Sequence, residues 1–143
     1  MREFLFKGFQ DFFEGKQIIN IDGEEVIGKW IEGDVRRGCY ISENGSGPFW
    51  HVVPETTSEF TGKRDRKGKK IFEHHICRFF CDDDSGSMDY VVRWDGDKSG
   101  FITEVVNEQF DEVEILDEFF AERCEVIGDI FDTRVTNEKR FKD

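Results

Sequence analysis

Residues 60–81 read FTGKRDRKGKKIFEHHICRFFC, and this stretch decides how the rest of the chain is interpreted. Its first half carries the densest positive charge in the sequence, whereas residues 71–80 are rich in aromatic and β-branched side chains and have no helix caps. Because Arg66-Lys67-Gly68 separates two segments of strand-like composition, the sequence predicts a tight turn followed by one long strand. We therefore expect a β-hairpin with a basic turn.

The apolar composition favours sheets over helices. The 143 residues include sixteen Phe, twelve Ile and eleven Val, against two Leu and a single Ala. Aromatic and β-branched side chains pack well on pleated surfaces, whereas Leu and Ala are the better helix formers. The sequence thus predicts a mainly β protein.

A chain of this length fits one domain, 1–143, which can bury its own core. We expect two possible subdomains within it: an N-terminal β-region at 1–53, packed on a C-terminal partly open barrel or curled sheet at 54–133. The polar tail at 134–143 is expected to fray.

Two local signals add detail to this organisation. Asp22-Gly23 is a favoured hairpin pair and predicts two paired strands within an insertion from 9 to 27. The spacing of Phe110, Val113, Leu116 and Phe120 changes the period to that of a helix. It predicts one short helix between 107 and 123.

Charge is distributed unevenly along the chain, whose formal net charge is −12. Six basic side chains and one acidic side chain lie at 63–70, but three basic and seventeen acidic side chains lie at 81–133. The candidate binding residues are the six cations of the basic loop: Lys63, Arg64, Arg66, Lys67, Lys69 and Lys70. The alternative is a solvated hairpin tip, because lysines often decorate such turns.

Several residues of the opening stretch resemble the core motif of the YopX family of phage and prophage proteins. These residues are Thr61-Gly62, Asp65, Gly68-Lys69-Lys70-Ile71-Phe72-Glu73 and Ile76. The segment from Glu125 to Phe131 is similar to the family's closing strand, but His74-His75 stand where members usually carry Gly-Asp. The resemblance implies a YopX-like fold and a phage or prophage gene product, and the family motif assigns no role to the basic loop.

Two clusters resemble metal sites, and each lacks something that the metal requires. Residues 95–106 match part of a calcium-binding EF-hand loop, but Val106 occupies the position of the bidentate carboxylate. The second cluster consists of His74, His75, Cys77 and Cys81. On one extended strand the two cysteines would lie ~13 Å apart, too far to share a zinc ion. We expect reduced cysteines, no metal and no cofactor.

The sequence brings no nucleophile, base and orienting group together by spacing, so we expect no enzyme and no catalytic residues. No apolar run reaches the ~20 residues that span a bilayer, and the N-terminus lacks the apolar region of a signal peptide. We therefore expect a cytoplasmic protein of the bacterial host without a membrane partner.

The expected partner is a protein, either a second copy of the chain or a phage or host protein. Self-association is expected because sixteen phenylalanines are many for this domain to bury alone and open sheets offer edges. The predicted function is a non-catalytic binding or assembly module. The alternative is a nucleic-acid-associated protein of phage DNA metabolism that acts through the basic loop, which the acidic surface disfavours but does not exclude.

Overall fold

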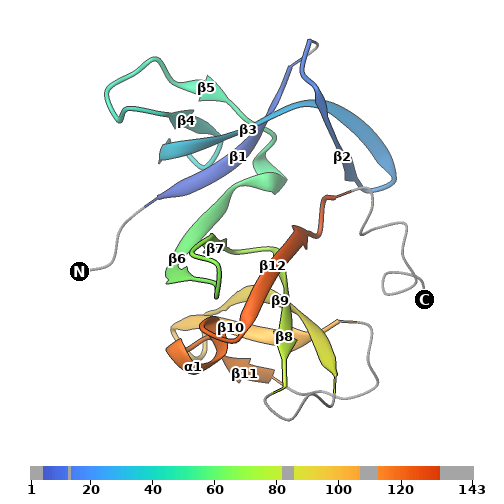
Figure 1. Ribbon diagram of the computed structural model, residues 1–143. Coiled ribbons are helices and arrows are strands. Elements are labelled where there is room, and N and C mark those ends of the chain that lie inside the picture. The colour runs from blue at the N-terminus through green and yellow to red at the C-terminus, as the bar shows by residue number, and fades with distance from the viewer. Residues whose placement is uncertain (1–4, 13, 82–85, 107–112, 133–143) are drawn as a thin grey trace. The chain divides into compact units, whose positions relative to one another are not determined.

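The computed structural model describes residues 5–12, 14–81, 86–106 and 113–132 (Figure 1). These residues form twelve β-strands, one turn of 3-10 helix and one short α-helix, so the predicted mainly β fold is confirmed. The chain divides into two compact units. The N-terminal unit is Met1–Phe60 with Phe131–Thr133, and the C-terminal unit is Thr61–Ile130 with Arg134–Asp143.

The N-terminal unit is an antiparallel sheet around one long strand, β3. Its elements are β1 (Phe6–Asp11), β2 (Gln17–Ile21), β3 (Glu24–Arg36), β4 (Tyr40–Ser42), β5 (Trp50–His51), the 3-10 turn η1 (Pro54–Thr56) and the first residues of β6 (Ser58–Arg64). The strand order is β5-β4-β3-β1-β6, and β2 also pairs with β3. Because Gly28 of β3 pairs with both Asp11 and Gln17, β1 and β2 lie on opposite edges of β3.

The hairpin between β2 and β3 is the one that the sequence predicted. Asp22 and Gly23 have φ angles of 51° and 88°, the left-handed conformation that a two-residue hairpin turn requires. That the hairpin belongs to an insertion stays a prediction. Beyond the hairpin, β3 continues without interruption into its pairing with β1. The segment between β1 and β2 crosses β3 at Gly28. Gly15 lies so close to Gly28 there that a Cβ on Gly15 would overlap the Gly28 backbone, so the crossing requires glycine.

The core of the N-terminal unit lies under β3 and its neighbours. Ile31, Ile41 and Val52 form a buried cluster, and Phe9 of β1 is fully buried. The hydroxyl oxygen of Thr56 accepts a hydrogen bond of 2.8 Å from the Phe9 amide, which fixes η1 against β1. The sheet is therefore tied internally by both apolar packing and side-chain hydrogen bonds.

The C-terminal unit is a second antiparallel sheet with a short helix. Its elements are the remainder of β6, β7 (Lys70–Phe72), β8 (His75–Phe80), β9 (Ser87–Asp95), β10 (Gly100–Val105), β11 (Val113–Ile115), α1 (Glu118–Ala121) and β12 (Cys124–Asp129). β6 pairs with β7, and the five-stranded sheet has the order β11-β10-β9-β8-β12. In the described residues this sheet is open at β11 and β12, so it is a sheet and not a closed barrel.

The core of the C-terminal unit is built from one face of this sheet together with α1. Its buried members include Ile71, Cys77, Tyr90, Val92, Phe101, Phe120 and Cys124. The rings of Tyr90 and Phe120 meet edge to face with centroids 5.1 Å apart, a favourable aromatic geometry. The helix is thus held to the sheet mainly by Phe120.

The prediction of one long strand from Ile71 to Phe80 is wrong. β7 and β8 are separated by a tight turn at Glu73-His74, and His74 has a φ of 75°. The His74 amide donates to the Val92 carbonyl at 2.8 Å, and the His74 carbonyl accepts from Ile130 at 3.0 Å. These bonds hold His74 in a left-handed conformation that glycine adopts more readily.

The single short helix is confirmed, but its predicted extent is wrong. Between 107 and 123, α1 covers only Glu118–Ala121, and the Asp117 carboxylate caps it by accepting from the Phe120 amide at 2.9 Å. Val113–Ile115 form β11 because these β-branched residues pair with β10. Residues 107–112 and 134–143 lie outside the described residues. Within the described part of the chain no helix is long and apolar enough to cross a membrane.

Candidate binding site on the basic turn

A buried carboxylate, Asp65, organises the turn that carries the basic residues. Its side chain accepts three backbone hydrogen bonds: Oδ1 from the amides of Lys67 and Lys69, each at 2.9 Å, and Oδ2 from the amide of Val126 in β12, also at 2.9 Å. Asp65 is only 6% exposed. The local bonds are typical of Asp in turns, but the bond to Val126 joins residues 61 positions apart.

The backbone of the turn is fastened to the same strand. The Asp65 amide donates to the Lys69 carbonyl at 2.8 Å, which closes the turn. The Arg66 amide donates to the Cys124 carbonyl of β12 at 3.0 Å. Gly68 supplies a φ of 84°. The predicted turn is confirmed, and it is a fixed part of the C-terminal unit.

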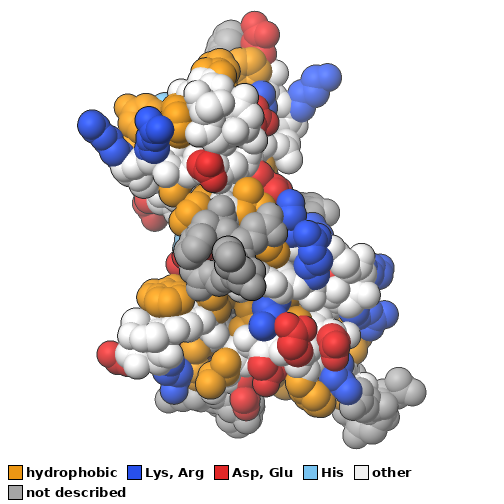
Figure 2. Space-filling model, turned by 90° about the vertical axis from the view of Figure 1, so that its left-hand side faces the viewer, with side chains coloured by type: hydrophobic (Ala, Val, Ile, Leu, Met, Phe, Trp, Pro, Cys, Tyr) orange, Lys and Arg blue, Asp and Glu red, His pale blue; other side chains and the backbone are white. Residues whose placement is uncertain are grey.

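Lys63 and Lys67 form ion pairs with acidic residues of the C-terminal unit. The Lys63 amine lies 3.0 Å from the Glu118 carboxylate, and the Lys67 amine lies 3.1 Å from the Glu125 carboxylate. Figure 2 shows basic and acidic side chains next to one another on one face of the molecule. The basic loop is therefore partly neutralised by acidic residues of the same chain, although these residues belong to the acidic segment at 81–133 and are distant in sequence.

The other cations lie at different sides of the turn. Arg64 donates from Nη1 to the Gly68 carbonyl at 3.2 Å, across the turn itself. The Arg66 guanidinium lies over the Phe80 ring, 4.4 Å from its centroid. Lys69 is exposed and Lys70 is half-buried. Arg64 and Arg66 therefore contact different parts of the C-terminal unit.

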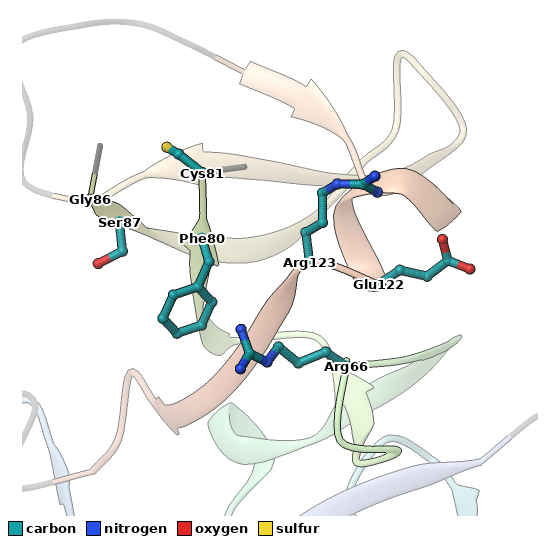
Figure 3. Close-up of a pocket in the computed structure, with 7 residues that line it drawn as sticks. All are labelled: Arg66, Phe80, Cys81, Gly86, Ser87, Glu122 and Arg123. Carbon is teal, nitrogen blue, oxygen red and sulfur yellow. The ribbon is translucent and has the colours of Figure 1, made fainter. Parts of the chain in front are cut away.

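A cavity of about 620 Å³ adjoins the turn within the C-terminal unit (Figure 3). Its lining residues come from four segments: Arg66, Phe80, Cys81, Gly86, Ser87, Glu122 and Arg123. Figure 3 shows Arg66 reaching toward the Phe80 ring, whereas Glu122 and Arg123 extend from the segment before β12. Sequence reasoning included only Arg66, because nothing in the spacing of the other residues indicates that they meet.

Backbone hydrogen bonds fix the frame of this cavity. The Phe80 amide donates to the Arg123 carbonyl at 3.0 Å, and the Cys81 amide donates to the Gly86 carbonyl at 3.1 Å. The Arg123 guanidinium lies over Phe119, 3.8 Å from the ring centroid, and donates to the Phe119 carbonyl at 3.2 Å. The cavity therefore has two arginines that each stack on an aromatic ring, a known favourable contact.

The residues of the suggested zinc cluster are dispersed. Nδ1 of His75 accepts a hydrogen bond of 3.0 Å from the Phe72 amide, so this nitrogen already stabilises the turn between β7 and β8. Cys77 is fully buried in the core, and Cys81 lines the cavity. Among the described residues no group of three His, Cys, Asp or Glu side chains could hold a metal ion.

Cys77 and Cys124 are buried neighbours. The hydrogen bond with Cys124, together with burial, raises the pKa of the Cys77 thiol well above its ordinary value of 9.0. Cys124 in turn donates from Sγ to the Ala121 carbonyl at 3.5 Å. Because the thiolate is the nucleophilic form, the raised pKa lowers the fraction of nucleophilic Cys77 at neutral pH.

The loop that resembles an EF-hand is a hairpin turn between β9 and β10. Oδ1 of Asp95 accepts from the amides of Asp97 and Lys98, at 2.9 and 3.3 Å, and Ser99 has a φ of 51°. The Asp95 carboxylate therefore stabilises the turn, as a polar hairpin loop requires.

The comparison with known families agrees with the motif in the opening stretch. The YopX protein family matches residues 13–135, which cover most of the chain and include the basic turn and every residue of the cavity. The chain therefore belongs to the YopX family. A search of curated proteins found no match.

Proposed function

We propose that this YopX-family chain is a non-catalytic binding module, which docks an acidic surface of a partner protein on its basic turn. Its relation to phage and prophage proteins supports a place in the cytosol of a bacterial host. The observation that carries the proposal is the anchoring of the turn by Asp65. Burying a charge has a high free-energy cost. A turn that is only a solvated hairpin tip has no need of a buried carboxylate that bonds to a strand 61 residues away.

The ion pairs at the turn favour a protein partner. Exposed salt bridges contribute little to stability, so carboxylates of a partner can replace Glu118 or Glu125 at low cost. Each pair has one exposed member, Glu118 at 71% and Lys67 at 63%, while Lys63 and Glu125 are 29% and 28% exposed. A partner can therefore reach each pair from one side. A rigid turn also loses less conformational entropy when it binds.

The same ion pairs disfavour a nucleic-acid partner. They place Glu118 and Glu125 beside the turn. A phosphate backbone carries a dense and continuous line of negative charge, so these carboxylates oppose it more strongly than they oppose the few carboxylates of a protein partner that can take their places. The absence of catalysis is supported by the raised pKa of the Cys77 thiol and by the engaged Nδ1 atom of His75. A module that recognises acidic protein surfaces is therefore the function that these contacts favour.

The test compares a short fluorescent poly-glutamate peptide with mixed-sequence single- and double-stranded oligonucleotides. We expect the wild-type chain to bind the peptide, and the variant Arg64→Glu/Arg66→Glu/Lys69→Glu to lose about tenfold or more in affinity. The matched control reverses the same number of charges at exposed lysines outside the turn: Lys16→Glu, Lys29→Glu and Lys98→Glu.

Three results would change the conclusion. A wild-type chain that ignores the peptide would refute the proposal. An equal loss of peptide affinity in the control variant would show that binding depends only on the net charge of the chain. Binding of the oligonucleotides, lost on reversal of the turn and decreasing steeply with salt, would move the chain to the nucleic-acid class.

A further inference from the structure

The cavity beside the basic turn differs from the turn in chemistry. The turn offers charge, whereas the cavity adds the apolar ring of Phe80, which lies next to Arg66. Its volume of about 620 Å³ lies within the range of ordinary ligand pockets and exceeds what one water molecule needs. It is therefore large enough to take a bulky side chain.

The charges around the cavity limit what can enter. Arg66 and Arg123 line it, but Glu122 lines it as well. The guanidinium faces of both arginines lie against aromatic rings, at 4.4 and 3.8 Å from the centroids. The N–H donors of a guanidinium lie in its own plane, so carboxylates meet these arginines at the edge of the guanidinium group. A multiply charged anion that entered the cavity would be repelled by the Glu122 carboxylate.

We propose that this cavity receives a large aromatic side chain of a protein partner, flanked in the partner's sequence by acidic residues that contact Arg66 and Arg123. The inference rests on the proposed function and names the anchor for the same docking surface. Arginine and aromatic residues around a pocket are the usual composition of binding hot spots, in which one buried side chain supplies most of the affinity. Arg66 belongs to both the turn and the cavity, so one continuous segment of a partner reaches both.

The backbone frame supports this role. Bonds from Arg66 to Cys124, from Phe80 to Arg123 and from Cys81 to Gly86 hold the three walls in place. A preformed cavity does not spend binding energy on its own ordering. The anchor therefore adds affinity beyond that of charge alone.

The test uses two short peptides that differ at one position, a run of glutamates with either Phe or Ala at its centre. We expect the wild-type chain to bind the Phe peptide at least about tenfold more tightly than the Ala peptide. The variant Ser87→Phe fills the cavity at an exposed strand position where an aromatic residue is tolerated. In this variant we expect the advantage of the Phe peptide to disappear, so that both peptides bind with similar affinity.

A second variant, Arg123→Gln, removes a positive charge from the cavity. We expect it to lower the affinity for both peptides, with a larger loss for the Phe peptide. The control Ser46→Phe adds the same ring at an exposed serine of the N-terminal unit and should change neither affinity. Circular dichroism and thermal melting show whether each variant is folded.

The outcomes separate this inference from the proposed function. If the wild-type chain binds both peptides equally, or if Ser87→Phe keeps the preference for the Phe peptide, the aromatic anchor is refuted and the basic turn alone explains binding. If the chain binds neither peptide, both proposals fail. An equal loss of the preference in the Ser46→Phe control would also refute the anchor.

Discussion

The two units are built from the same kind of antiparallel sheet, yet they expose different chemistry. In the N-terminal unit the side chains of Phe12, Ile18 and Ile27 are 41%, 47% and 46% exposed. They are neighbours, because Ile18 pairs with Ile27 and the Phe12 amide donates to the Ile27 carbonyl. In the C-terminal unit the basic turn is exposed and its anchor, Asp65, is buried. The patch at β2 and β3 thus offers apolar area, and the basic turn offers fixed charge.

This difference has a practical meaning for binding. Apolar contacts strengthen with salts that are excluded from the protein surface, such as sulfate, whereas contacts between exposed charges weaken with ionic strength. A partner of the N-terminal unit and a partner of the C-terminal unit would therefore respond to salt in opposite directions. The predictions below test the two kinds of surface, starting with the largest expected effect.

Asp65→Asn should cause the largest loss of stability, about 4 kcal/mol, because the uncharged amide cannot accept all three backbone hydrogen bonds that the buried carboxylate accepts. Urea unfolding measures the loss. The matched control is Asp95→Asn, a half-buried turn aspartate that accepts two local bonds and should lose less than about 1 kcal/mol. Equal losses in both variants would show that the bond to Val126 is unimportant.

Gly28→Ala should destabilise the N-terminal unit by about 3 kcal/mol, because the added Cβ would overlap the Gln10 carbonyl oxygen of the neighbouring strand. Gly96→Ala is the control, since a Cβ there meets nothing within 4 Å. Thermal melting measures both. A Gly28→Ala protein as stable as the wild type would contradict the close crossing at β3.

Ile18→Lys/Ile27→Lys tests the apolar surface of the N-terminal unit. We expect the wild-type chain to self-associate at micromolar concentration and this variant to be monomeric, because the two added charges face each other across β2 and β3. Static light scattering gives the molar mass. The reversal of Arg64, Arg66 and Lys69 serves as the control and should leave self-association intact. A monomeric wild-type chain would rule out this role of the surface.

The smallest effect concerns Cys77. Its raised pKa means that the folded thiol holds its proton more tightly than the unfolded thiol. The resulting stability is complete below the ordinary pKa of 9.0 and decreases as the pH rises above it. At pH 8 we expect a thiol reagent to label Cys39 and Cys81, which are half-buried, much faster than Cys77. Rapid labelling of Cys77 in folded protein would contradict the buried pair with Cys124.

Local rules were sufficient for the parts of the fold that depend on neighbours in sequence. Asp22-Gly23 and the loop after Asp95 form the hairpin turns that their residue types predict. The break at His74 was missed because histidine carries no strong turn signal, and two backbone bonds from distant strands hold it. The length of α1 was overestimated because Val113 fits a helical spacing as well as a strand.

The candidate site shows the same limit more clearly. Its six cations were found by composition, but the carboxylate that arranges them was the one residue of the run with the opposite charge. The cavity combines residues from positions 66, 80–81, 86–87 and 122–123, which meet only after β8, β9 and β12 have formed. No periodic pattern connects such positions, so contacts of this kind require the structure.

The hydrogen bond between Asp65 and Val126 also determines when the protein acquires its charged surface during synthesis. The ribosome synthesises the chain from its N-terminus, so the turn leaves the ribosome well before β12 does. Contacts between distant residues form late, because closing the intervening loop costs entropy. A nascent chain that ends before Val126 therefore has the cations but not their fixed arrangement, and we expect only a chain that includes β12 to recognise its partner.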